Sequence, residues 1–488
     1  MHGVTERVSR LLADLTRSTV ASTAYATAWA ARLTGDDGKP VFPQARPWLA
    51  DHQHADGSWG GSVPNPYDRL VCTLAAVLAL REIDEPWASS AVRSGVDYLH
   101  KHATDWRGAP GEVVGFELAA PYLAEQASKA GLLSLDGFAD LVALRADKLA
   151  RVPAGALTRE PTTLLYSLEV LGDLVQPRDV VGFAGPNGSM SNNPPATAAL
   201  WAATGAPTAL EYLRSAAQST GDGGMPEIFP ISVTEPAWAI YLLHRAGLTT
   251  DEAKPHVDRL LALADGAEFG LGTSAEFPVP DSDDTAMVAN VVHAFGHDDT
   301  ALLESLLHYE KDDHFIGFPY ERGTPVTANA RIAEALSRRP DRFASQIKKA
   351  ITFLMDSRHD GAWWDDKWHL SPYYATAQVV FGLAGSTPPD TLSATRKWLL
   401  DGQHPDGSWG MAGGQPEETA YAVLSLDAMG DQHGPVPADT MRRAADYLGE
   451  HLDDPSYAEL WMSKGLYIPV APARAAVLSA YAVSRGQP

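Results

Sequence analysis

Three aspartates, Asp281, Asp283 and Asp284, stand within one short segment, residues 277–286. Crowding and burial raise the pKa of carboxylic acids, so such a cluster can keep a proton near neutral pH and deliver it as a general acid. An acid of this kind could protonate even a weak base such as an alkene. A simpler interpretation is that the aspartates only cap a helix.

The flanking sequence places these aspartates at the start of a helix. Two prolines, Pro278 and Pro280, end the preceding element, and apolar residues follow at helical spacing over 287–295. The pattern predicts Asp281 as the N-cap and the other two aspartates in the first turn, where free N–H groups and the helix dipole stabilise carboxylates. Acidic first turns are common, so this segment alone does not establish a function.

The overall composition limits the possible classes. The chain has 488 residues, a net charge of −23 and one cysteine, Cys72, in an apolar run. The length predicts two large units. The negative charge disfavours nucleic acids and anionic lipid surfaces as partners, and no stretch is apolar enough to span a bilayer. Residues 1–17 are typical of an amphipathic surface helix, not of a signal peptide, and we expect a cytoplasmic protein without disulfides.

An internal repeat organises the chain. Residues 48–60 return with the same spacing as residues 398–410, both ending in Asp-Gly-Ser-Trp-Gly, and a weaker copy ends at Trp363. Each copy reads as a helix, a tight Asp-Gly turn, a Trp that fills the gap, and an alanine-rich second helix. Strand signals are nearly absent. Helical hairpins of this kind must stack on neighbours, either as an open array or as a closed α/α toroid, and the pattern does not decide between them.

The repeat and the aspartate segment together resemble the class II terpene cyclases, the family of copalyl diphosphate synthases and, more distantly, squalene–hopene cyclases. The resemblance covers nearly the whole chain and includes residues 22–29, 115–118, 161–169 and 366–374. One departure is Ala26, where the family usually has Asp.

The resemblance implies an all-α fold of two α/α toroid domains, named β and γ, with the active site between them. It predicts residues 1–35 as the N-terminal helix of the β domain, 36–248 as the inserted γ domain, and 249–488 as the rest of the β domain. Motifs of a class I terpene synthase are not found in the sequence.

The resemblance also assigns roles to residues. Asp283 is the general acid, Asp281 and Asp284 position and recharge it, and Asn329 is a candidate hydrogen-bond partner of Asp283, the alternative being an ordinary helix-surface residue. Lys367 and Lys148 match positions that bind the substrate diphosphate. Mg²⁺ would bridge that diphosphate to carboxylates, for which Glu112 and Asp105 are the candidates.

Aromatic side chains can stabilise a carbocation without reacting with it. Most Trp residues in helical arrays instead fill the repeats. The candidates to line the cavity are Trp238, Trp363, Trp364, Trp368, Tyr373, Tyr374 and Tyr166.

The expected function is cyclisation of geranylgeranyl diphosphate to a bicyclic diphosphate of copalyl or rearranged type, the product passing to a separate class I terpene synthase. One alternative is a farnesyl diphosphate cyclase that forms a drimane-type product. Squalene-type cyclisation, a carbohydrate-active toroid, a non-catalytic helical scaffold and a protein prenyltransferase subunit fit the motifs less well. The deprotonation site does not transfer, because Tyr166 and Glu227 replace the His and Asn of plant relatives.

Overall fold

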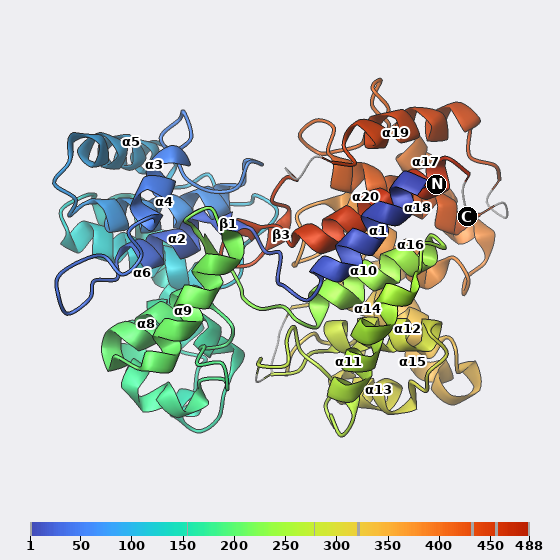
Figure 1. Cartoon of the computed structure of the whole chain (residues 1–488), viewed down its shortest axis with the longest axis horizontal. Coiled ribbons are helices and arrows are strands. Elements are labelled where there is room, and N and C mark those ends of the chain that lie inside the picture. The colour runs from blue at the N-terminus through green and yellow to red at the C-terminus, as the bar shows by residue number, and fades with distance from the viewer. Residues whose placement is uncertain are drawn as a thin grey trace.

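The computed structural model describes residues 2–153, 155–277, 279–319, 323–430, 434–453 and 457–486. The chain folds into two helical units that lie side by side (Figure 1). Helices are the main regular elements of the described part, and its strands are four two-residue segments, which confirms the predicted all-α class. The strands form two short antiparallel pairs, β1 (Ser22–Thr23) with β2 (Met225–Pro226), and β3 (Trp461–Met462) with β4 (Leu466–Tyr467).

The first unit is built from the blue to green segments α2 to α9 of Figure 1. Its α-helices are α2 (Ala24–Ala31), α3 (Ala45–Asp51), α4 (Pro66–Leu80), α5 (Pro86–His102), α6 (Phe116–Lys129), α7 (Ala139–Leu149), α8 (Pro194–Thr204) and α9 (Pro207–Thr220). The 3-10 segment η3 (Thr163–Val170) completes an inner ring, because α2, α4, α6, η3 and α8 each contact the next and α8 contacts α2.

The second unit contains α1 (His2–Asp14) and all helices from α10 onward. These are α10 (Thr234–Arg245), α11 (Lys254–Ala264), α12 (Ser282–Ala294), α13 (Thr300–Ser305), α14 (Val326–Leu336), α15 (Pro340–Asp356), α16 (Pro372–Leu383), α17 (Ser393–Asp401), α18 (Pro416–Met429), α19 (Ala438–Glu450) and α20 (Val470–Ser484). The even-numbered helices from α10 to α20 contact one another in order, and α20 closes the ring against α10. The array is therefore a closed toroid, the choice that the repeat pattern left open.

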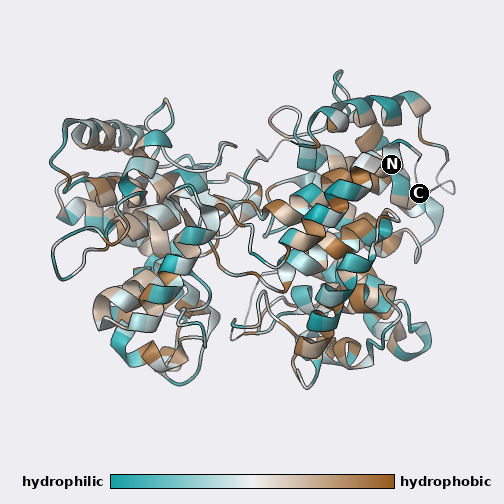
Figure 2. Cartoon of the chain, viewed as in Figure 1, coloured by the Kyte–Doolittle hydropathy of each residue, from teal (hydrophilic) through white to brown (hydrophobic). Residues whose placement is uncertain are grey.

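Burial follows this two-layer plan. Inner helices such as α16 are buried along their whole length, whereas the outer helix α19 buries only one face. In Figure 2 the hydrophilic colour is prominent on α19, and apolar residues concentrate toward the middle of each unit. No described helix is long and apolar enough to cross a membrane.

The repeated tryptophans share one structural role. The indole Nε1 of Trp59, Trp364 and Trp409 donates to the carbonyl oxygen of the leucine ten residues earlier, at 2.7, 2.6 and 2.7 Å. The backbone N–H of each tryptophan donates to a threonine hydroxyl of the following inner helix, at 3.0, 3.1 and 2.9 Å. All three side chains are fully buried. Each tryptophan thus joins an outer helix to the next inner helix.

The hydrophobic cores divide the chain differently from the predicted domain boundaries. Residues 24–33 pack in the core of the first unit, although the prediction placed residues 1–35 with the second unit. Residues 233–243 pack in the core of the second unit, although the prediction placed them in the first. Helix α1 does pack in the second unit, against α20. Helical periodicity shows that a segment is amphipathic, but not which neighbour covers it.

Candidate active site

The aspartate segment caps helix α12 as predicted. Asp281 is the N-cap, and its Oδ1 accepts a hydrogen bond of 2.8 Å from the backbone N–H of Asp284. The Asp284 carboxylate accepts a hydrogen bond of 2.7 Å from the hydroxyl of Thr234 on α10. Both residues are nearly inaccessible, at 2% and 4% exposure. The helix cap and the acid cluster are therefore the same feature.

Asp283 is the accessible member of the cluster. Its side chain is 17% exposed and makes a close ion pair with the Arg331 guanidinium. Arg331 lies on α14, is 1% exposed, and donates a second hydrogen bond of 2.6 Å to the Tyr374 hydroxyl. Its Cζ lies 4.6 Å from the Trp238 ring centroid, and the Trp238 indole N–H also donates to Tyr374, at 3.0 Å. A cationic and aromatic wall thus faces the accessible acid.

Burial and mutual repulsion favour protonation of this cluster. Burial, with the charge of Asp284 adding to it, raises the pKa of Asp281 well above its ordinary value. Burial also raises the pKa of Asp284 to about 7, although the hydrogen bond from Thr234 opposes the change. The Asp281 Oδ2 has no hydrogen-bond partner in the described part of the chain, which suits a protonated oxygen. The cluster therefore retains a proton near neutral pH.

The predicted contact between Asn329 and Asp283 is wrong. The Asn329 side chain accepts from the backbone N–H of Phe315 at 2.9 Å and donates to the carbonyl oxygens of Phe315 and Pro325, both at 2.8 Å. These contacts occupy both ends of the amide, so Asn329 fixes the loop beside α14. Arg331, two residues later on the same helix, is the partner of Asp283.

The two predicted lysines lie on different units and within electrostatic range of one another. Burial lowers the pKa of Lys367 to about 7; Asp283 opposes this change, and Lys148 of the first unit adds to it. The Lys367 ammonium lies 4.4 Å from the Trp368 ring centroid. Lys148 donates to Glu117 at 2.6 Å. A site with two amines therefore lies near the acid cluster, and it suits an anionic group.

Of the two predicted metal ligands, only Glu112 lies beside this site. Burial raises its pKa, the charge of Glu117 adds to the rise, and Lys148 counters it. Asp105 is exposed and instead binds the His102 ring at 2.6 Å. Among the described residues no group of three or more His, Cys, Asp or Glu side chains could hold a metal ion. Glu112 and Glu117 are the carboxylates beside Lys148 that could hold a Mg²⁺ ion, whereas Asp105 pairs with His102.

Comparisons with known proteins agree with this geometry. The squalene-hopene cyclase C-terminal domain family matches residues 322–464. The chain is 33% identical to a type B diterpene cyclase of Mycobacterium tuberculosis over 94% of this chain and 95% of that protein. It is also 33% identical to a copalyl diphosphate synthase of Streptomyces cyslabdanicus, over 94% and 91% of the two chains.

The chain belongs to the bacterial class II diterpene cyclases. The structure of an ent-copalyl diphosphate synthase from Streptomyces platensis superposes with a TM-score of 0.82 at 30% identity, covering 99% of the cyclase and 100% of that chain. The predicted family, the toroid fold and the assignment as an enzyme are thereby confirmed.

Three of the predicted aromatic residues lie beside the acid cluster of the cyclase. Trp238 and Tyr374 contact Arg331, and Trp368 lies beside Lys367, with its ring 5.9 Å from that of Phe318. Tyr166 lies on the first unit, where its hydroxyl bonds to Ser463 at 2.6 Å.

The prediction is wrong for the other three. Trp364 is the buried repeat tryptophan described above. Trp363 stacks on His359 and on Trp398 of the outer helix α17, at centroid distances of 4.5 and 6.4 Å. Tyr373 stacks on the same Trp398, at 4.8 Å. On a helix, adjacent residues face about 100° apart, so Tyr374 points to the acid and Tyr373 points away from it.

Sequence reasoning missed several residues of the cyclase site. Arg331 and Glu117 lie close to the predicted Asn329 and Glu112, and Trp461 packs its ring 5.3 Å from Tyr374. Asp366 is half-buried and accepts backbone hydrogen bonds from Thr327 and Trp368 at 3.1 and 3.0 Å. The available signal was a charged residue within an otherwise apolar inner helix, as at Arg331.

Proposed function

We propose that the cyclase protonates the terminal alkene of geranylgeranyl diphosphate and closes two rings while the diphosphate stays attached. The observation that carries this proposal is the cluster of Asp281, Asp283 and Asp284, in which two acids are buried and the third is accessible. The names of relatives that cover nearly the whole chain support a copalyl-type product.

The proton donor in this proposal is Asp283. The buried Asp281 and Asp284 keep a proton in the cluster, and Asp283 is the member that substrate can reach. When the proton has moved to the alkene, the Arg331 guanidinium stabilises the carboxylate that is left. The positive charge that stabilises the Asp283 carboxylate is thus in place before the reaction begins.

The cation that forms needs a surface that is electron-rich and does not react. The rings of Trp238, Tyr374 and Trp461 pack together beside the acid, with Trp238 and Trp461 at a centroid distance of 6.5 Å. Aromatic faces attract a cation through their quadrupole. We place the developing rings of the product against this wall.

The diphosphate would bind at the two lysines, Lys148 and Lys367. Their amines are hydrogen-bond donors, and a bound diphosphate would favour the charged form of Lys367, whose pKa burial lowers to about 7. Mg²⁺, with Glu112 and Glu117 as its protein ligands, would neutralise the remaining phosphate charge when it is bound. A product that keeps its diphosphate suits a separate enzyme that ionises diphosphates, a class I terpene synthase.

The test is product analysis by mass spectrometry after phosphatase treatment. Wild type and Asp283→Ala are incubated with geranylgeranyl or farnesyl diphosphate, with Mg²⁺ or EDTA. The expected result is a bicyclic alcohol from geranylgeranyl diphosphate, with at least a ~100-fold lower yield for Asp283→Ala, because general acids contribute about 10²–10⁴-fold. If only farnesyl diphosphate is cyclised, the assignment of geranylgeranyl diphosphate as the substrate is wrong. If Asp283→Ala gives the same yield as wild type, the assignment of Asp283 as the general acid is wrong.

A further inference from the structure

A buried carboxylate lies directly behind the aromatic wall. Glu417 is in the first turn of α18 and is 1% exposed. Its Oε1 accepts a hydrogen bond of 3.1 Å from the indole N–H of Trp461, whose ring packs against Tyr374 and Trp238. Its Oε2 has no hydrogen-bond partner in the part of the chain that the structure describes. The wall is thus backed by an acidic side chain outside the aspartate cluster.

Glu417 has no charged partner among the described residues. The basic group within ion-pair distance there is the His369 ring, whose Nε2 lies 3.5 Å from the Glu417 Oε1. The Nδ1 of His369 accepts a hydrogen bond of 3.1 Å from the backbone N–H of Ser371, so the ring carries its proton on Nε2 and is neutral. The N-terminus of α18 and the indole N–H stabilise the carboxylate instead. A net negative charge therefore remains buried behind the wall.

The aromatic wall lies between charges of opposite sign. Arg331 contacts it at the Tyr374 hydroxyl, whereas Glu417 contacts it at Trp461. Both charges act on Tyr421, which packs edge-on against Tyr374 at a centroid distance of 5.0 Å. Burial raises the pKa of Tyr421 well above its ordinary value, the charge of Glu417 adds to the rise, and Arg331 opposes it. The field along the wall therefore favours a positive charge near Trp461 over one near Arg331.

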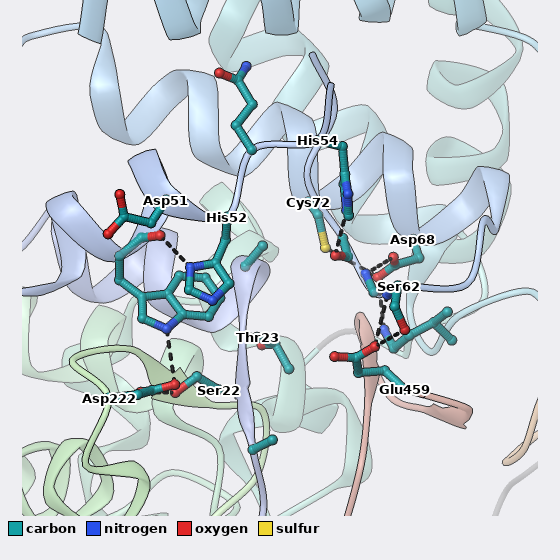
Figure 3. A pocket seen from close by; sticks show the side chains of 17 residues that line it. Ser22, Thr23, Asp51, His52, His54, Ser62, Asp68, Cys72, Asp222 and Glu459 are labelled. Atoms are coloured by element: carbon teal, nitrogen blue, oxygen red, sulfur yellow. Dashed lines mark hydrogen bonds between the residues drawn. The ribbon is translucent and has the colours of Figure 1, made fainter. Parts of the chain in front are cut away.

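Trp461 is also held in place by the β3–β4 hairpin that carries it. Lys464, between the two strands, donates to Glu169 of the first unit at 2.5 Å, and both side chains of this ion pair are fully buried. Figure 3 shows a pocket between the units at which Glu459, two residues before Trp461, accepts a hydrogen bond of 2.6 Å from the Ser62 hydroxyl. The position of the Trp461 ring therefore does not depend on Glu417 alone.

We propose that Glu417 draws the positive charge along the wall during cyclisation and so favours closure of the second ring. The proposal rests on the proposed function. Protonation by Asp283 forms the first cation near Arg331, and each ring closure moves the positive charge further along the prenyl chain, away from the acid. Glu417, and the Trp461 indole whose N–H it polarises, stabilise the later cation more than the first. Glu417 is thus a positioning residue, to which no bond forms and no proton passes.

The test is Glu417→Gln, which keeps the size of the side chain and an oxygen that can accept from Trp461 but removes the charge. Wild type and variant are incubated with geranylgeranyl diphosphate, and the dephosphorylated products are separated by gas chromatography and mass spectrometry. Monocyclic products should rise at least ~5-fold relative to bicyclic ones, with KM within about 2-fold, because substrate binding precedes the later cation. Glu417→Asp keeps the charge and should restore most of the bicyclic share.

The control is Glu418→Gln, at the adjacent and equally buried glutamate, which accepts from the Ser371 hydroxyl at 2.6 Å and from the backbone N–H of Met411 at 3.2 Å. This variant should keep the wild-type product ratio. An unchanged ratio in Glu417→Gln would contradict the role of Glu417. A Glu417→Asp variant with the same products as Glu417→Gln would also contradict it, because geometry and not charge would then be the cause.

A second variant keeps the proposal testable if Glu417→Gln does not fold. Trp461→Phe keeps an aromatic ring in the wall but loses the N–H that binds Glu417, so it should shift the products in the same direction, and an unchanged ratio would again contradict the proposal. If wild type forms no cyclic diphosphate, the proposed function fails. If wild type cyclises and the variants give its product ratio, only the role of Glu417 fails.

Discussion

The contact between Asp283 and Arg331 explains how an accessible carboxyl group can act as a strong acid. A buried guanidinium remains charged, so it stabilises the carboxylate form of Asp283. Asp281 and Asp284, which lack such a partner, hold the proton instead. Proton storage and proton delivery are thereby divided among three neighbouring side chains.

Substitution of Arg331 should therefore damage chemistry more than binding. For Arg331→Gln we expect kcat to fall about 10²- to 10³-fold, with KM within a few-fold, because the acid loses the partner that stabilises its conjugate base. Steady-state kinetics with geranylgeranyl diphosphate measure both constants. Arg338→Gln is the control, since Arg338 binds Asp299 at 2.7 Å, away from the acid cluster. A wild-type kcat in Arg331→Gln would contradict this role.

Asp284 should lower the free energy of unfolding at neutral pH. Its pKa in the folded state is about 7, whereas an unfolded aspartate titrates near 4, so the folded state binds more protons between these values. The free energy of unfolding then falls as pH rises from about 4 to about 7. Asp284→Asn removes the ionisation and should be more stable than wild type by about 1–3 kcal/mol at pH 8.

Urea denaturation at pH 5 and pH 8 measures this effect. The advantage of Asp284→Asn should be clearly smaller at pH 5, where wild-type Asp284 is protonated. An equal difference at both pH values would mean that repulsion within the cluster is not its cause.

At the residue scale, the sequence predicted the acids but not their surroundings. Asp281, Asp283 and Asp284 are recognisable because they follow prolines and begin a helix. Arg331 is 48 residues away from Asp283 in the chain, and only the packing of α14 against α12 brings the two together. Asn329 was a reasonable candidate on the same helix, but the backbone of Phe315 occupies its amide.

At the scale of elements, the three copies of the turn show which spacing matters. The distance along the chain from leucine to tryptophan is the same for Trp59, Trp364 and Trp409. The Asp-Gly pair comes one residue earlier in the middle copy, where Asp360 adopts a positive φ of 49°. If the repeats are aligned on their Asp-Gly pairs, Trp363 matches Trp59 and Trp409. The hydrogen bonds instead show that Trp364 is the equivalent residue.

The neighbours Trp363 and Trp364 should respond differently to the same substitution. Trp364→Phe loses the hydrogen bond to Leu354 and leaves a cavity, so we expect a loss of about 1–3 kcal/mol in the free energy of unfolding. Trp363→Phe changes a partly buried stacked ring and should lose less than about 0.5–1 kcal/mol. Urea denaturation compares the two, and equal losses would contradict the shared role of the repeat tryptophans.

At the scale of the whole molecule, the β3–β4 hairpin connects the two units. Besides the buried Lys464 pair, the backbone N–H of Leu466 donates to Asp68 at 2.8 Å, and Glu459 accepts from the Ser62 hydroxyl at 2.6 Å. These contacts join residues almost 400 positions apart in the chain. The sequence predicted two helical units but not this link, because a two-residue strand pair has no periodicity to detect.

Removal of Lys464 should weaken this connection. Lys464→Met leaves the buried Glu169 without its cation, and we expect a loss of about 3–5 kcal/mol in the free energy of unfolding. Lys464→Met combined with Glu169→Gln should recover part of that loss. Chemical denaturation followed by tryptophan fluorescence measures both variants. Lys397→Met, which removes an exposed ion pair, is the control and should change the free energy of unfolding by less than about 0.5 kcal/mol. A change as small as this in Lys464→Met would refute the role of the hairpin.

Helix α1 packs against α20, and the hydroxyl of Thr19 accepts a hydrogen bond of 2.9 Å from the backbone N–H of Ala471, 452 residues later. During synthesis on the ribosome, α1 emerges long before the partner that covers its apolar face. At about 5–20 residues per second, that interval is roughly 20–100 s. The first unit can fold in this time, whereas the ring of the second unit cannot close until translation has passed α20. A nascent chain of this protein therefore carries an apolar helix that is not fully covered until α20 has been made, which makes it a natural client for chaperones that act at the ribosome.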